Sequence, residues 1–161
     1  MNSFKDLSPA SKIWVYQSNR ELTESEVTEL RQKADLFIET WSSHGNALDA
    51  AIELYYNRFI VIGVDEGQAM ASGCSIDKSV SFIKNVEAFY NISLMDRMQV
   101  AYRKGESFHT CKLNEFEKLL KEGSIDENTI VFNNLVSTKK EFDKNWEVPL
   151  KNSWHIKLVE N

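Results

Sequence analysis

The stretch "RFIVIGVDEG", Arg58–Gly67, decides how this chain folds. It contains an apolar run from Phe59 to Val64, with a basic residue before it and "DEG" after it. A short apolar run between turn signals is typical of a buried strand. We therefore expect this segment to be the central strand of a sheet. Its six residues are too few to span a bilayer.

An amphipathic helix is expected on each side of this strand in the sequence. Apolar residues recur at helical spacing in "LTESEVTELRQKADLFIETW", residues 22–41, where Thr23 and Glu26 match a capping box. Gly45 is expected to end that helix. The same spacing predicts a second helix over residues 75–90.

Alternating apolar and polar residues predict the remaining strands. "KIWVYQSN", residues 12–19, alternates in this way, and "LDAAIELYYN", residues 48–57, precedes the central strand and is joined to it by a tight turn. A hairpin pattern covers residues 98–113 and turns at Lys104–Gly105. The order up to about residue 105 is therefore strand, helix, strand, strand, helix, strand.

That order is the ferredoxin-like βαββαβ arrangement, an α+β fold in which an antiparallel sheet carries both helices on one face. Residues 106–161 add a further strand, a helix and another strand. We expect two parts, a ferredoxin-like core over residues 1–105 and a C-terminal β-α-β extension over residues 106–161 that packs on the core.

The amino-acid composition indicates which classes of partner are disfavoured. The chain has 24 acidic and 19 basic residues and a net charge of −5, which disfavours nucleic acid because phosphate recognition needs a basic surface. Two cysteines and an N-terminus without a signal-peptide pattern favour a cytoplasmic protein that does not insert into a membrane. His109 and Cys111 supply only two metal ligands, so we expect no metal site and no cofactor.

The ferredoxin-like connectivity places two loops at the same end of the sheet. The loop after the first helix carries His44. The loop between the central strand and the second helix, "DEGQAMASGCS", carries polar and small side chains, and Asp77 follows it in the first helical turn. The candidate binding residues of this second loop are Asp65, Glu66, Ser72, Gly73 and Ser75.

Cys74 would be the nucleophile of a catalytic or redox site in this second loop. A helix N-terminus lowers the pKa of a thiol, and His44 could act as its base with Asp77 or Asp65 orienting the imidazole. The structural alternative is that Ser75 caps the helix, Gly73 permits the turn and Cys74 packs as a small hydrophobic residue. A Walker A phosphate loop is excluded, because Cys74 stands where that motif requires lysine.

Trp14 and Tyr16 form a second candidate binding surface. They alternate with aliphatic residues in the first strand, and we expect them on the sheet face opposite the helices, together with Phe59. Open aromatic faces on this architecture stack nucleic-acid bases, which the acidic charge disfavours here. Either the C-terminal residues or a second copy of the chain, in a homodimer, could cover this face.

Residues 112–135, "KLNEFEKLLKEGSIDENTIVFNNL", resemble the helix–glycine–strand part of GYF-like peptide-binding domains. The resemblance implies peptide binding by the C-terminal part of the chain. The Gly-Tyr-Phe triad that names that family is absent. An amphipathic helix packed on a sheet explains the same residues.

Five phrases spread over nearly the whole chain resemble a family of small bacterial proteins that often carry the label "ABC transporter ATPase". They are "IWVYQSNRELTESEV", "FIETWSSHG", "RFIVIGVDE", "ASGCSIDKSVSFI" and "NTIVFNNLV". The resemblance implies a cytoplasmic bacterial protein, and the label implies ATP binding. The Walker A loop, the Walker B strand and the "LSGGQ" signature of such ATPases are absent from this sequence. The family therefore supplies no established activity.

Taken together, these features favour a non-catalytic binding or interaction protein over an enzyme. The partner would be a protein or a small molecule, bound through the aromatic face, the C-terminal part or self-association. Two alternatives stay open. One is a small enzyme or redox protein that uses Cys74 with His44, and the other is ATP binding, as the family label suggests.

Overall fold

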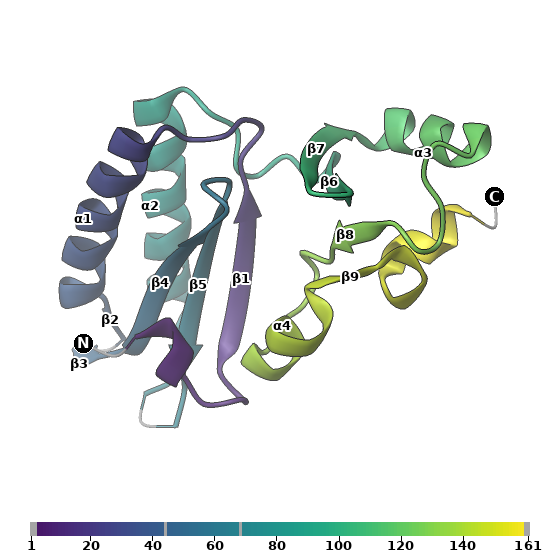
Figure 1. Cartoon of the computed structure of the whole chain (residues 1–161). Coiled ribbons are helices and arrows are strands. Elements are labelled where there is room, and N and C mark those ends of the chain that lie inside the picture. Colours follow the sequence, from purple (N-terminus) through teal and green to yellow (C-terminus); the bar gives the residue numbers. More distant parts are fainter. Residues whose placement is uncertain (1–2, 44, 68, 160–161) are drawn as a thin grey trace. The chain divides into compact units, whose positions relative to one another are not determined.

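The computed structural model describes residues 3–43, 45–67 and 69–159 (Figure 1). Its helices and antiparallel sheets confirm the α+β class. The chain forms two compact units. Unit 1 comprises Met1–Met95 and Ser137–Lys140, and unit 2 comprises Asp96–Val136 and Glu141–Asn161. The predicted boundary after residue 105 falls within the hairpin that begins unit 2.

The sheet of unit 1 is built around the strand that the opening stretch predicts. Its three strands pair in the order β1-β5-β4, antiparallel throughout. Their bounds are β1 Lys12–Gln17, β4 Asp49–Tyr55 and β5 Phe59–Asp65, and a short separate ladder pairs β2 Ser42–Ser43 with β3 Asn46–Ala47. Every residue from Phe59 to Val64 is buried. The prediction of a central strand is confirmed, and the structure adds that both of its faces are covered.

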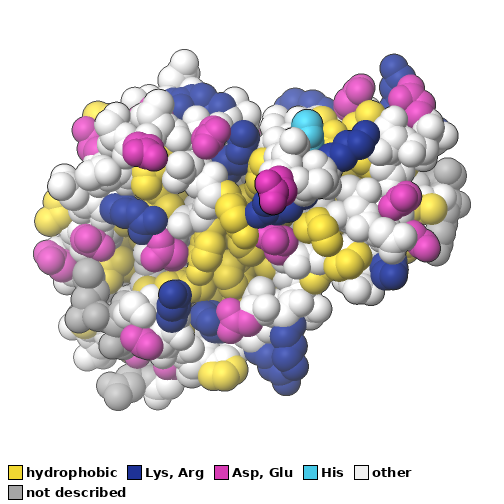
Figure 2. All heavy atoms as spheres, in the orientation of Figure 1, with side chains coloured by type: hydrophobic (Ala, Val, Ile, Leu, Met, Phe, Trp, Pro, Cys, Tyr) yellow, Lys and Arg dark blue, Asp and Glu magenta, His cyan; other side chains and the backbone are white. Residues whose placement is uncertain are grey.

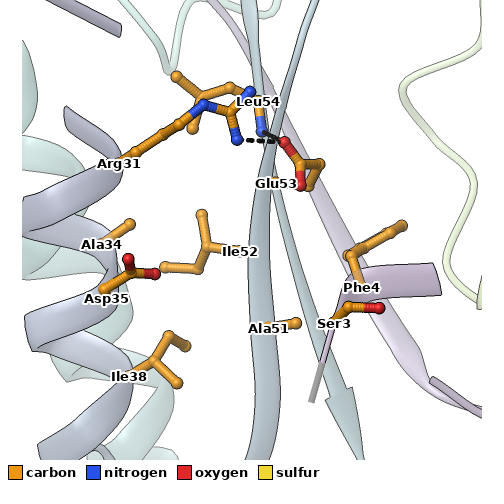
Figure 3. Close-up of a pocket in the computed structure, with 10 residues that line it drawn as sticks. All are labelled: Ser3, Phe4, Arg31, Ala34, Asp35, Ile38, Ala51, Ile52, Glu53 and Leu54. Carbon is orange, nitrogen blue, oxygen red and sulfur yellow. Dashed lines mark hydrogen bonds and ion pairs between the residues drawn. The ribbon is translucent and has the colours of Figure 1, made fainter. Parts of the chain in front are cut away.

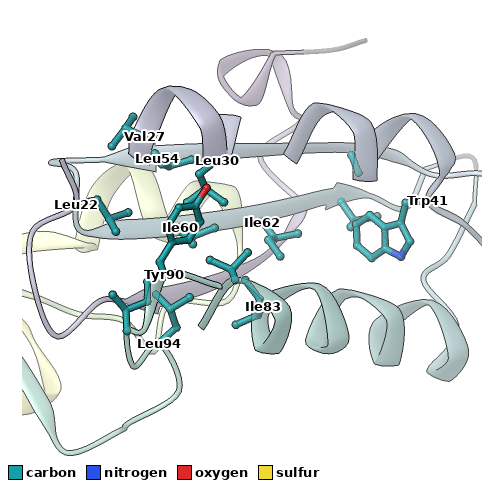
Figure 4. Packing of buried hydrophobic residues seen from close by; sticks show 14 of the residues in the cluster. Leu22, Val27, Leu30, Trp41, Leu54, Ile60, Ile62, Ile83, Tyr90 and Leu94 are labelled. Atoms are coloured by element: carbon teal, nitrogen blue, oxygen red, sulfur yellow. The ribbon is translucent and has the colours of Figure 1, made fainter. Parts of the chain in front are cut away.

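Two helices cover one face of this sheet. They are α1 (Glu24–Thr40) and α2 (Gly73–Tyr90), and Figure 1 shows both on the same side. Figure 4 shows how their apolar side chains meet those of β5, with Leu30 and Ile83 against Ile60 and Ile62. Burial of apolar area in this cluster is the main stabilising contribution to unit 1.

The N-terminal segment covers the opposite face of the sheet. The short 3-10 helix η1 (Phe4–Asp6) brings Phe4 against the ring of Tyr55, with centroids 6.0 Å apart, and Leu7 follows it. A Cβ at Gly63 would lie 2.5 Å from Leu7 Cδ1. Glycine in the middle of β5 therefore lets the N-terminal segment lie directly on the strand.

The fourth strand of the expected ferredoxin-like sheet is not found beside β1. Residues 99–104, expected in that position, pair within a second sheet in unit 2. Beside β1 the chain returns as residues 137–139 instead. Ile13 N–H donates to the Ser137 carbonyl at 2.9 Å, and Lys139 N–H donates to the Ser11 carbonyl at 2.9 Å. The specific ferredoxin-like topology is thus not confirmed.

Unit 2 is a second, smaller α+β assembly. Its strands pair antiparallel in the order β7-β6-β8-β9. The elements are β6 Gln99–Lys104, β7 Ser107–Lys112, α3 Leu113–Glu122, β8 Ile130–Phe132, α4 Lys139–Asn145, β9 Glu147–Pro149, η2 Leu150–Asn152 and η3 Trp154–Leu158. The first two residues of α4 belong to unit 1. Phe116 of α3 is fully buried against Val131 and Leu150, so α3 packs on this sheet as an amphipathic helix.

Charged side chains of both signs are interspersed over the face of the molecule shown in Figure 2. No continuous basic area appears on that face. Within the described ranges, no helix combines the length and the apolar character needed to cross a membrane.

Arg20 links the start of α1 to the end of α2. Its guanidinium donates two hydrogen bonds to the Glu26 carboxylate, at 2.8 and 2.9 Å, and a third to the Tyr90 carbonyl at 2.9 Å. Glu26 also accepts from Thr23 N–H and so completes the predicted capping box. The hydrogen bond from Arg20 is the main reason why the pKa of Glu26 falls to about 2.

Replacement of Glu26 by glutamine tests this link. Folding favours the ionised carboxylate, so its stabilisation is complete above about pH 5 and is lost as the pH falls towards pH 2. Glutamine can still accept from Thr23 N–H but carries no charge. Because Arg20 is partly exposed, we expect Glu26→Gln to lower the free energy of unfolding at neutral pH by about 1 kcal/mol. Urea unfolding should also show a smaller loss of stability on acidification than in the parent chain.

Glu24→Gln is the matched control, since Glu24 lies in the same first turn of α1 and has no side-chain partner among the described residues. It should leave the acid dependence nearly unchanged. Identical acid profiles for Glu26→Gln and the parent chain would contradict the assigned role of Arg20.

Candidate functional site

The loop before α2 is built as a helix cap. The Ser72 hydroxyl accepts from Ser75 N–H at 3.2 Å, and the Ser75 hydroxyl donates to the Ser72 carbonyl at 2.9 Å. Ser72, rather than the predicted Ser75, is therefore the N-cap residue. Cys74 and Asp77 are both exposed. The thiol is not packed as a small hydrophobic residue, so that part of the structural alternative is wrong.

The two predicted loops lie side by side. Trp41, at the end of α1, donates its indole N–H to the Ser75 carbonyl at 2.8 Å in a buried contact, and β2 contacts α2. The C-terminal end of α1 and the N-terminal end of α2 are thus held together. His44 lies outside the described residues. Its pairing with Cys74 stays a prediction.

The acidic residues of the second loop stabilise the loop itself. Asp65 accepts from Gly67 N–H at 3.0 Å, and Glu66 accepts from Ala71 N–H at 2.8 Å. Lys12 completes an ion pair with Glu66 at 3.1 Å. These carboxylates occupy backbone donors that a phosphate-binding loop would need for its ligand.

Trp14 and Tyr16 do not share a face with Phe59. Directly opposite residues in an antiparallel pair point to the same side, and Trp14 lies opposite Ile62 while Tyr16 lies opposite Ile60. Both aromatic side chains are partly buried against the helix-side core. The predicted placement on an open aromatic face is therefore wrong, and a binding role for these residues stays a prediction.

Unit 2 contains a hydrogen-bonded serine–histidine pair that is sealed from solvent. Ser153 Oγ lies 2.7 Å from His155 Nδ1, and His155 is only 1% exposed. Burial lowers the pKa of His155 to about 4, so the ring is neutral at physiological pH. A substrate has no access to this pair. Among the described residues, no group of three or more His, Cys, Asp or Glu side chains lies close enough to hold a metal ion.

A groove of about 280 Å³ lies along the outer edge of β4. Figure 3 shows its walls, with α1 on one side and η1 on the other. Three separate segments line it, and their residues are Ser3, Phe4, Arg31, Ala34, Asp35, Ile38, Ala51, Ile52, Glu53 and Leu54. The floor is mainly apolar and the rim is charged, which is the usual composition of a ligand-binding site.

The groove follows a strand edge at which backbone N–H and carbonyl groups point away from the sheet. β4 pairs with β5 on its inner side and is the outermost strand of its sheet. Leu54 N–H donates to the Glu53 carboxylate at 3.0 Å, which shows that this amide points away from β5. Outward and inward amides alternate along an antiparallel strand. The N–H and carbonyl of Ile52 therefore also point into the groove.

Glu53 closes one end of this edge. Its carboxylate bonds both Leu54 N–H and the Arg31 guanidinium, so the side chain crosses from the strand to α1 (Figure 3). Charged side chains that cover an edge are a common protection against unwanted strand pairing. Among the described residues, no side chain bonds to the edge beside Ile52, and the Asp35 carboxylate has no hydrogen-bond or ion-pair partner.

The groove residues were not predicted from the sequence. Arg31 and Asp35 were not singled out, because polar residues at these positions are ordinary on the outer side of an amphipathic helix. One signal was available, because the second strand lies at the edge of the expected sheet and carries Glu53 among apolar residues.

The two cysteines should differ in reactivity. Cys74 is exposed, whereas Cys111 is partly buried and its burial, followed by the charge of Glu115, raises the pKa of that thiol. With iodoacetamide at about pH 7.5 we expect Cys74 to react roughly tenfold faster than Cys111. Mass spectrometry of Cys74→Ser and Cys111→Ser variants would assign the two rates. Equal rates in the folded chain, or faster reaction of Cys111, would contradict the structure.

Comparisons with protein-family models, curated proteins and solved structures find no match for this chain. The functional argument therefore rests on the geometry of the groove and of the Cys74 loop.

Proposed function

We propose that this chain is a non-catalytic binding protein that receives an extended polypeptide segment along the outer edge of β4. One observation carries the proposal, namely that the outward backbone groups of Ile52 lie in a preformed groove. A segment in extended conformation can pair with such an edge through main-chain hydrogen bonds, while flanking walls contact its side chains.

The two edges of the unit 1 sheet differ in a way that supports this assignment. The β1 edge is partly occupied, because residues 137–139 bond to Ser11 and Ile13 there. On the β4 edge, Glu53 covers Leu54 N–H, and the groove continues beside Ile52. A groove between α1 and the short helix η1 accommodates an extended chain more readily than it accommodates the surface of a globular protein.

The ferredoxin-like topology, the cytoplasmic location and the homodimer that the sequence suggests are each compatible with this proposal. Strands β1, β5 and β4, with α1 and α2 on one face, match three strands of a ferredoxin-like sheet, and residues 137–139 would take the place of the fourth. The two free cysteines are compatible with a cytoplasmic bacterial protein. A homodimer would be an alternative use of the same β4 edge.

The two alternatives have weaker support. A thiol-dependent reaction is favoured by the exposed position of Cys74 near the start of α2, but no base is described beside it. ATP binding is disfavoured, because Asp65 and Glu66 engage the amides of the loop.

Titration of the ¹⁵N-labelled full chain with a defined peptide tests the proposal. The probe is N-acetylated, C-amidated Thr-Val-Thr-Lys-Thr-Val-Thr, which favours an extended conformation. We expect saturable chemical-shift changes centred on the Ile52 amide and slower hydrogen exchange of that amide in the complex, because it gains a hydrogen bond.

The matched control is the same peptide with N-methyl groups on its three central residues, which removes its main-chain donors and leaves its side chains. Its outer residues keep their N–H groups, but loss of the central donors opposite Ile52 should make it bind far more weakly. Equal binding of the two peptides, absence of binding by the unmethylated peptide, or shift changes confined to residues outside the groove would each contradict the proposal.

A further inference from the structure

We infer that the segment bound at β4 carries a basic side chain opposite Asp35 and an apolar side chain two residues away, opposite Ile38. This inference depends on the proposed function and specifies the chemistry of its partner. It follows from the charges left unpaired in the groove and from the spacing of the side chains along α1.

The groove presents one carboxylate that is free to pair with a ligand. Arg31 and Glu53 neutralise each other at one end. Asp35 lies one helical turn further along α1, and Figure 3 shows its carboxylate directed towards Ile52 across the groove. Asp35 has no ionic or hydrogen-bond partner among the described residues. The part of the groove beside Ile52 is therefore negative and complementary to a lysine or arginine side chain.

The next position along α1 is apolar. Ile38 is partly buried in the helix-side core and lines the groove beyond Asp35 (Figure 3). Along an α-helix, the four residues from Arg31 to Asp35 rise about 6 Å and the three from Asp35 to Ile38 rise about 4.5 Å. Alternate residues of an added strand lie about 6.6 Å apart on one face. Successive same-face side chains of the ligand are thus spaced about 2 Å wider than Asp35 and Ile38. A long, flexible basic side chain spans that difference, so one such side chain can reach Asp35 while the next same-face side chain contacts Ile38.

The other face of the added strand meets η1. Ser3 and Phe4 form that wall, and Phe4 is buried against Tyr55. Since Phe4 is already packed against Tyr55, we expect small side chains on this side of the added strand. The expected ligand pattern is thus basic and apolar residues at two-residue spacing, with small residues between them.

Two peptides that differ in the sign of one charged residue test the inference on the full chain. In Thr-Val-Thr-Lys-Thr-Val-Thr, a valine lies two residues from the lysine in both chain directions, so the orientation of binding does not matter. The comparison peptide has glutamate in place of lysine. Fluorescence anisotropy with labelled peptides should give about five- to tenfold tighter binding of the lysine peptide, from one attractive and one repulsive exposed pair.

Variants of α1 assign the preference to Asp35. Asp35→Asn should reduce the ratio to less than about twofold, and Asp35→Lys should reverse it. Glu39→Gln is the matched control, because it removes the same charge from an exposed residue of α1 outside the groove and should leave the preference intact. A lysine preference that survives Asp35→Asn would overturn the inference, since it would reflect only the net charge of the chain.

The remaining outcomes separate this inference from the proposed function. Equal binding of the two peptides by the parent chain would overturn the basic-residue inference and leave edge binding in place. Binding of neither peptide would overturn both. If sedimentation shows a dimer that Ile52→Pro dissociates and Ile52→Val does not, the edge receives a second copy of the chain and the peptide inference is wrong.

Discussion

The complete burial of β5 is the constraint on which the rest of unit 1 depends. Its residues Phe59–Val64 are apolar on both faces, so the sheet needs α1 and α2 on one side and the N-terminal segment on the other. A sheet covered in this way exposes its hydrogen-bonding groups only at its edges. Residues 137–139 partly cover the β1 edge, and the β4 edge becomes the place where a partner can add main-chain hydrogen bonds.

Local signals were sufficient to predict most elements of unit 1. The central strand, both long helices and the Thr23–Glu26 capping box are confirmed, because each depends on residues close together in the sequence. Gly45 was wrong as a helix cap, since α1 ends at Thr40 and Gly45 has a positive φ after the β2 strand. The partner of residues 99–104 was also wrong. An alternating strand has the same pattern whichever sheet it joins, so the sequence does not specify that pairing.

The two candidate sites also differ in how far apart in the sequence their residues lie. The closeness of the start of α2 to the end of α1 was predicted from the connectivity, whereas the exposure of Cys74 was left open. The groove requires segments that are far apart in the sequence, around Ser3, Asp35 and Ile52. Asp35 alone has the pattern of an ordinary solvated helix residue. Its significance comes from the strand edge beside it, which no described residue pairs with and which only the three-dimensional arrangement reveals.

The central claim is that the β4 edge is open at Ile52 in the free chain. Amide hydrogen exchange of the unliganded protein measures this directly, because a paired amide exchanges slowly and an unpaired one rapidly. The account predicts that the Ile52 amide exchanges much faster than the amides of Ala51 and Glu53, which pair with β5. It should also exchange much faster than the amide of Ile62 in β5 itself. Protection of Ile52 equal to that of its two neighbours would show that the edge is already occupied and would contradict the account.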